Sequence, residues 1–171
     1  MLGQMNEIRS NELDSLIWVK INDRLISLNK KPIKIFDNSD NSEMRLFAGR
    51  VAERLIVKDA VFEHSNNDSI SRYCGGECIY AHEVTGNHEL DIIQKLNNND
   101  LNYFAEIVFQ GWLSSDSHRD AISEDYYTKT TVYTIINYSE DEKYFKLVAI
   151  WLEEDEYWGS LGKKDPNRYK D

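Results

Sequence analysis

The feature that most restricts the fold is a segment near the C-terminal end, residues 144–152, in which both alternating sets of positions are largely apolar. Successive side chains of a β-strand point to opposite faces. One set contains Phe145, Leu147, Ala149 and Trp151, and the other contains Val148, Ile150 and Leu152. A strand that is apolar on both faces belongs to a sheet that is covered on both sides. We therefore expect an inner strand with helices over both faces.

Two further segments carry strand signals. Residues 130–138 are rich in β-branched and aromatic side chains, and residues 77–83 alternate in polarity. The polar run Ser139-Glu140-Asp141-Glu142-Lys143 separates 130–138 from 144–152. This spacing predicts a hairpin of the last two strands, paired antiparallel.

Three segments have helical periodicity. Residues 11–29 form the first, with Asn11 as its predicted cap and Lys30-Lys31-Pro32 after its end. A second helix follows the polar residues 37–42, and a third begins near Asp100. The apolar stripe of the second helix consists of Met44, Phe47, Ala48, Val51, Ala52 and Leu55.

These elements predict an α+β fold, a three-layer α-β-α sandwich with a largely antiparallel central sheet. A length of 171 residues suits one domain. We expect an N-terminal extension over residues 1–10, one domain over residues 11–152, and a polar, poorly ordered tail over residues 153–171.

The net charge of −10 restricts the partners. A phosphate backbone or an anionic membrane is repelled by most of such a surface, so we expect neither as a partner. No apolar run approaches the roughly 20 residues that span a bilayer. The start of the chain lacks the apolar core of a secretory signal, so either the protein stays inside the cell or this is a mature chain.

The two cysteines, Cys74 and Cys78, flank a Gly75-Gly76 pair. In an extended strand their Cα atoms would lie about 13 Å apart, too far for a disulfide. A tight turn at the glycines would bring them together. A disulfide and a pair of buried thiols are both compatible with this spacing.

Three short segments occur in an order that resembles the CAP superfamily, which includes cysteine-rich secretory proteins, antigen 5 and pathogenesis-related proteins. The first is the helix that contains Ala48-Gly49-Arg50-Val51-Ala52-Glu53-Arg54 and ends in Phe62-Glu63-His64-Ser65. The second is Gly76-Glu77-Cys78-Ile79, and the third runs from Trp112 through Ser114 and Ser115 to His118-Arg119. The resemblance extends over roughly residues 17–152 and implies the family's α-β-α fold.

The sequence departs from the family pattern at two positions. Cys78 stands where the family usually has asparagine, and Ser115 stands where many eukaryotic members carry a second glutamate. The family's tetrad of two histidines and two glutamates is therefore incomplete.

The resemblance implies that His64, Glu77 and His118 converge in one cleft, beside Ser115 and Asp116. Two imidazoles and a carboxylate match the ligands of some catalytic zinc sites, so one interpretation is a site for a divalent metal such as zinc, with no other cofactor expected. Alternatively, Glu77 hydrogen-bonds both histidines and joins the three segments. In either case the two rings should lie within about 8 Å of each other, whereas strand alternation places His82 on the opposite face from Glu77.

The function that the resemblance implies is that of a secreted, extracellular CAP-type module that binds a protein, a peptide or a small molecule, and we expect no efficient catalysis. The alternative is a metal-dependent hydrolase, acting on peptides, with His64 and His118 as ligands and Glu77 as a ligand or general base. The sequence lacks both the His-Glu-x-x-His helix of metalloproteases and the Gly-x-Ser-x-Gly elbow of serine hydrolases.

Overall fold

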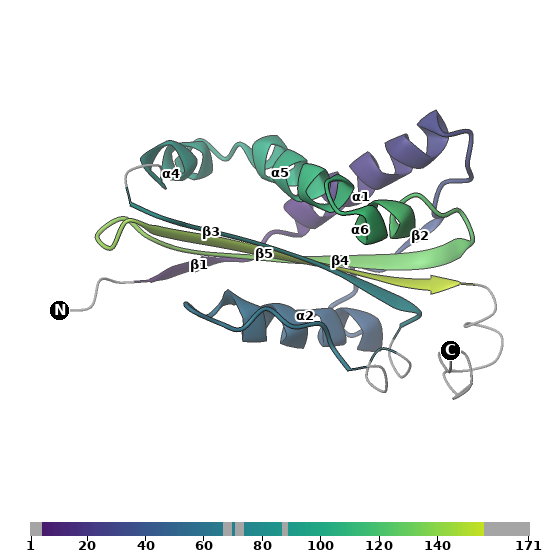
Figure 1. The fold of residues 1–171 in the computed structure, drawn as a ribbon, viewed down its shortest axis with the longest axis horizontal. Coiled ribbons are helices and arrows are strands. Elements are labelled where there is room, and N and C mark those ends of the chain that lie inside the picture. The colour runs from purple at the N-terminus through teal and green to yellow at the C-terminus, as the bar shows by residue number, and fades with distance from the viewer. Residues whose placement is uncertain (1–4, 67–69, 71–73, 87–88, 156–171) are drawn as a thin grey trace.

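The computed structural model describes residues 5–66, 70, 74–86 and 89–155, which form an α+β fold with a mostly antiparallel sheet (Figure 1). The helices are α1 (Asn11–Ser27), α2 (Glu43–Ile56), α4 (Glu89–Asn97), α5 (Leu101–Leu113) and α6 (Asp116–Ala121). The strands are β1 (Asn6–Ile8), β2 (Ile35–Phe36), β3 (Gly76–Thr85), β4 (Tyr127–Ser139) and β5 (Tyr144–Asp155).

The strands of the sheet follow the order β1-β4-β5-β3, and the short β2 also pairs with β4. β4 and β5 form the predicted antiparallel hairpin, in which Thr131 lies opposite Leu152 and Tyr138 opposite Phe145. β3 pairs antiparallel with the other side of β5, so β5 is an inner strand and β3 is an edge. The hairpin and the participation of residues 77–83 are confirmed.

Helices lie on both sides of this sheet, with α1, α4, α5 and α6 on one face and α2 on the other (Figure 1). Each face has its own buried apolar cluster. The first includes Phe145, Leu147, Ala149 and Trp151 of β5, and the second includes Val148, Ile150 and Leu152. The two-faced apolar pattern of residues 144–152 therefore predicted the burial of this strand correctly.

Two helix boundaries differ from the sequence prediction. α1 is capped by Ser10, whose hydroxyl oxygen accepts a hydrogen bond from the Leu13 N–H at 3.1 Å, and not by Asn11. α2 ends at Ile56, so His64 does not lie at a helix end as predicted. Val57 itself is extended, and the chain then turns, with the Ala60 N–H donating to the Val57 carbonyl oxygen at 3.2 Å. The same carbonyl oxygen accepts a hydrogen bond from the Lys146 side chain.

The sheet extends beyond both ends of the predicted domain. Asn6–Ile8, within the predicted extension, pairs antiparallel with β4 as strand β1. β5 runs to Asp155, three residues beyond the predicted end of the domain. Residues 156–171 of the predicted tail lie outside the described residues.

Cys74 and Cys78 are free thiols, and both are buried. Burial is the main cause that raises the pKa of each thiol above its ordinary value, and the nearby Glu77 and Glu153 carboxylates raise it further. These thiols are therefore protonated at neutral pH and have little nucleophilic character.

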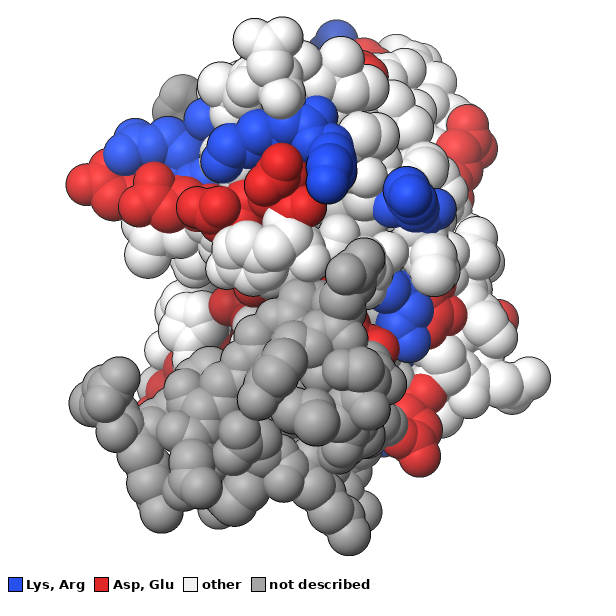
Figure 2. All heavy atoms as spheres, turned by 90° about the vertical axis from the view of Figure 1, so that its right-hand side faces the viewer, with Lys and Arg blue, Asp and Glu red and all other residues white. Residues whose placement is uncertain are grey.

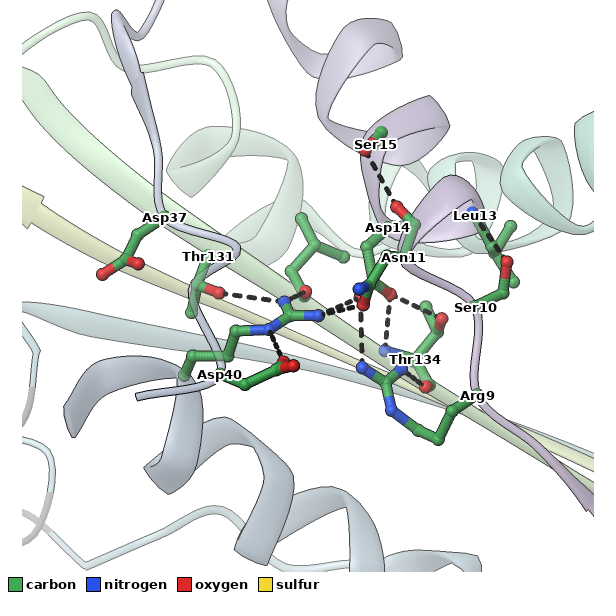
Figure 3. A network of polar contacts seen from close by, with 12 residues as sticks. Arg9, Ser10, Asn11, Leu13, Asp14, Ser15, Asp37, Asp40, Thr131 and Thr134 are labelled. Carbon is green, nitrogen blue, oxygen red and sulfur yellow. Dashed lines mark hydrogen bonds and ion pairs between the residues drawn. The ribbon is translucent and has the colours of Figure 1, made fainter. Parts of the chain in front are cut away.

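A buried ion pair forms hydrogen bonds with the edge of β4 in the interval between the short strands β1 and β2 (Figure 3). β1 pairs with residues 136–138 and β2 with residues 129–130. In the interval between them, Arg45 donates to the Val132 carbonyl at 2.7 Å, and Asp14 accepts from the Thr134 N–H at 2.8 Å. Arg45 and Asp14 also pair with each other at 2.9 Å.

The pair connects both helical layers to the sheet, since Asp14 lies in α1 and Arg45 in α2. The Arg45 side chain is 1% exposed and that of Asp14 is 0% exposed. Burial raises the pKa of the Asp14 carboxyl above its ordinary value, while Arg9, Thr134 and Arg45 oppose that rise. Loss of either partner would remove the nearer counterion of a buried charge, because Arg45 would keep only Asp40 and Asp14 would keep only Arg9, each at 3.4 Å.

We therefore expect Asp14→Ala to lower the free energy of unfolding by about 3–5 kcal/mol, because the buried Arg45 guanidinium then keeps only the exposed carboxylate of Asp40, at 3.4 Å. Chemical denaturation measures this change. Asp23→Ala, at an exposed position of the same helix, is the matched control and should shift stability by no more than about 0.5 kcal/mol. Equal effects of the two substitutions would contradict this role of Asp14.

Candidate functional site

The predicted site lies at the open edge of the sheet, beside the first residues of β3. His64 belongs to the segment that follows α2 on one face, and His118 belongs to α6 on the other. The two imidazole rings nevertheless approach each other, with centroids 5.9 Å apart and planes inclined by 55°. The prediction that the rings lie within about 8 Å is confirmed, and we call His64, Ser65, Glu77 and His118 the histidine site.

Glu77 holds the His64 segment against β3. Its Oε1 atom lies 3.2 Å from Nδ1 of His64 and accepts a hydrogen bond from the Ser65 N–H at 2.8 Å. Its Oε2 atom accepts a hydrogen bond from the Ser65 hydroxyl at 2.6 Å. The Glu77 side chain is 0% exposed whereas that of His64 is 47% exposed. Glu77 is thus a buried support beneath an accessible imidazole.

This contact determines which nitrogen of His64 is available. A carboxylate beside Nδ1 favours the tautomer that carries its proton there, because that N–H can donate to it. Nε2 then has a free lone pair for a ligand proton or a cation. A carboxylate behind an imidazole in this way is a common outer partner of metal-binding histidines.

His118 completes the pair from α6. Among the described residues, no hydrogen bond joins His118 to Glu77. The alternative prediction, in which Glu77 hydrogen-bonds both histidines, is therefore wrong for His118. Burial is the main cause that lowers the pKa of His118 below its ordinary value of 6.5, and the neighbouring His64 lowers it further. His118 is therefore neutral at physiological pH.

Ser115 and Asp116 begin α6 but are engaged within that helix. Asp116 pairs with Arg119 at 2.6 Å, and 87% of its side chain is exposed. The Ser115 hydroxyl lies 3.3 Å from that of Ser117. Among the described residues, neither side chain forms a hydrogen bond with His64 or His118.

Three further residues show where the sequence prediction was right and what it missed. His82 stacks on Tyr80 at 6.3 Å and contacts Phe145 of the other face, as strand alternation predicted. Phe62 lies edge-on to His64 at 6.1 Å and is 50% exposed, and Val61 beside it is 72% exposed. Neither of these two apolar residues was assigned a role from the sequence. They extend the accessible surface of the histidine site.

The donor set fits a metal only in part. Within the described residues, no group of three or more His, Cys, Asp or Glu side chains is arranged to hold a metal ion. The two imidazoles are suitable donors, but both Glu77 oxygens already accept hydrogen bonds. Of the three predicted ligands, His64 and His118 therefore remain suitable metal donors. Glu77 instead contacts Nδ1 of His64 and orients its ring.

The distribution of charged side chains on the surface shows whether a local basic patch could bind a nucleic acid despite the negative net charge. Figure 2 shows the end of the molecule at the right of Figure 1, where Lys and Arg side chains lie beside Asp and Glu side chains. Ion pairs of this kind include Lys129 with Glu154 at 3.1 Å. The described part of this face thus offers no continuous basic surface to a nucleic acid.

Comparisons with known proteins give little further guidance. No protein-family model and no curated protein matches the chain. The structure of an outer surface protein from Borrelia burgdorferi aligns with 90% of this chain and 100% of that chain, with 15% sequence identity and a TM-score of 0.45. In the part of the chain that is described, no helix has the length and apolar character needed to cross a bilayer.

Glu77→Ala should lower the free energy of unfolding by about 1–3 kcal/mol, because the Ser65 and His64 donors lose a buried charged acceptor. It should also separate the two rings, which NMR detects as a loss of cross-relaxation between the His64 and His118 ring protons. Glu63→Ala is the control, since that neighbouring side chain is exposed. If ring proximity survives in Glu77→Ala, Glu77 does not position His64.

The lowered pKa of His118 predicts a pH dependence of stability. The unfolded chain binds this proton more readily than the folded chain, so the free energy of unfolding should decrease as pH falls below 6.5. Denaturation at a series of pH values checks this, and His118→Gln should reduce the slope. In an NMR titration, His64→Ala should raise the His118 pKa, because it removes the electrostatic effect of the His64 ring that lowers this pKa. An unchanged pKa would exclude coupling between the rings.

Proposed function

We propose that this chain is a CAP-type binding module whose histidine site contacts a protein, peptide or small-molecule ligand. In this proposal the α+β fold is the family's three-layer sandwich, and the protein acts outside the cell, as the resemblance implies. The observation that carries the proposal is the approach of His64 and His118 to 5.9 Å beside Glu77. It brings together side chains of the three segments on which the resemblance rests.

The chemistry of the site favours binding over hydrolysis. Hydrolysis needs an activated water or nucleophile, a positioned base and donors for the developing charge. Glu77 is buried and occupied by Ser65 and His64, and Asp116 is paired with Arg119. An accessible imidazole beside the exposed Phe62 instead suits a ligand that combines a hydrogen-bonding group with an apolar part.

The second candidate is a metal-dependent hydrolase, and the distance between the rings is the observation in its favour. Two imidazoles at this separation can share one zinc ion at Zn–N distances near 2 Å. A bound zinc would supply Lewis acidity at this position. His64 and His118 would hold the ion, and Glu77 would orient His64 through Nδ1. In this candidate a further group, from water or substrate, must complete the coordination.

We expect no turnover above background in a peptidase and esterase screen, with or without added zinc, because no free general base stands beside the histidines among the described residues. The matched comparison is the His64→Ala, His118→Ala double variant, with its fold checked by circular dichroism. Turnover by the natural chain that disappears in the double variant would establish the hydrolase instead. Calorimetric titration with zinc separately reports whether the two histidines bind the ion.

A further inference from the structure

A groove remote from the histidine site runs along α2 where this helix faces β4 and β1. Two cavities form it. One, of about 470 Å³, is lined by Met5, Glu7, Glu53, Ile56, Val57, Lys58, Asn137 and Glu142. The other, of about 280 Å³, is lined by Asp40, Arg45, Leu46, Gly49, Arg50, Glu53 and Tyr133. The cavities share Glu53, so they lie end to end along the helix.

One stripe of α2 and the residue after it form a wall of the groove. Leu46, Gly49, Glu53 and Val57 recur at intervals of three and four residues, beside the stripe that α2 buries in the core. From Leu46 to Val57 the wall spans about 16 Å at 1.5 Å per residue. An extended peptide covers that length with about five residues at 3.3 Å each.

The groove combines apolar surface with unpaired acids. Leu46 is 48% exposed, Val57 is 59% exposed and Met5 is 37% exposed. Among the described residues, Glu7 and Glu53 make no ion pair, and both are exposed. Such a surface attracts an aliphatic stem that ends in a positive charge.

The basic residues of the groove are already engaged. Arg45 is held by Asp14 at 2.9 Å, and Lys58 lies 3.8 Å from Glu142. Arg50 lies over the Phe47 ring, with its guanidinium carbon 5.7 Å from the ring centroid. Of the described acids that line the groove, Asp40 pairs with Arg45 and Glu142 pairs with Lys58, so Glu7 and Glu53 are the ones without an ion pair.

We propose that this groove binds a basic peptide segment in which Lys or Arg side chains alternate with apolar ones. The carboxylates repel fatty acids and other anionic lipids. A second copy of this chain is disfavoured because each copy carries a charge of −10. Such a segment supplies both groups that the groove receives, cations for Glu7 and Glu53 and apolar side chains for the surface of Met5, Leu46 and Val57.

Fluorescence anisotropy with a labelled peptide of alternating lysine and leucine tests the proposal on the full chain. The expected dissociation constant is below about 100 µM in low-salt buffer and rises with salt. A peptide of alternating glutamate and leucine should bind at least about tenfold more weakly, because the acids repel it. Equal binding of the two peptides, or no binding of the lysine peptide, would overturn the proposal.

Variants locate the binding. Val57→Arg places a bulky cation in the groove and should weaken binding at least about tenfold, whereas Val19→Arg, at an exposed position of α1, should change it less than about twofold. Glu7→Gln with Glu53→Gln should weaken binding about fivefold. Glu12→Gln with Asp23→Asn makes the same change of net charge on α1 and should have little effect. If the α1 variants weaken binding as much as the groove variants, the peptide responds to net charge and the groove is not its site.

Discussion

The structure depends on the buried contact between Asp14 and Arg45. These two side chains occupy the interval on the edge of β4 that neither β1 nor β2 covers, and they satisfy the backbone groups of Val132 and Thr134 there. A strand edge without partners invites pairing with another chain. Here side chains from two helices take the place of the missing strand residues, so the positions of α1 and α2 relative to the sheet are fixed by the same contact that closes its edge.

The histidine site also forms at an edge of the sheet, where segments from its two faces meet. β3 is the last strand on that side, and segments from the two faces of the sheet can meet only around such an edge. Glu77 faces the α2 side, where it receives His64 and Ser65, and α6 brings His118 from the other side. The site therefore joins two helical layers without occupying the core of either, and this explains why one imidazole is accessible while its supporting carboxylate is buried.

Much of the fold was predictable because its signals are local. The apolar stripe of α2 and the two-faced pattern of β5 record burial within a few adjacent residues, and both predictions are confirmed. The end of α2 was not predicted, because Val57, Val61 and Phe62 continue the apolar character of the helix although they are exposed. β1 and β2, of three and two residues, are too short to show a periodicity.

The buried charges could not be recognised from the sequence. Asp14 contacts Thr134 across 120 positions and Arg45 contacts Val132 across 87, and no spacing rule connects residues so far apart. The candidate site was easier to predict because its three segments form a recognisable order. That order indicated that His64, Glu77 and His118 lie close together. It could not show that Ser65 donates a hydrogen bond to Glu77 or that Asp116 pairs with Arg119 within α6.

β5, an inner strand of this sheet, is also the last strand along the described part of the chain. When α1 and α2 are synthesised, the strands on which both helices pack do not yet exist, and Asp14 and Arg45 have only water around them. The apolar stripes of the helices stay exposed until residues 127–155 emerge and the sheet can form between them. Folding therefore needs residues 127–155 and joins distant parts of the chain, which makes it slower than folding through local contacts.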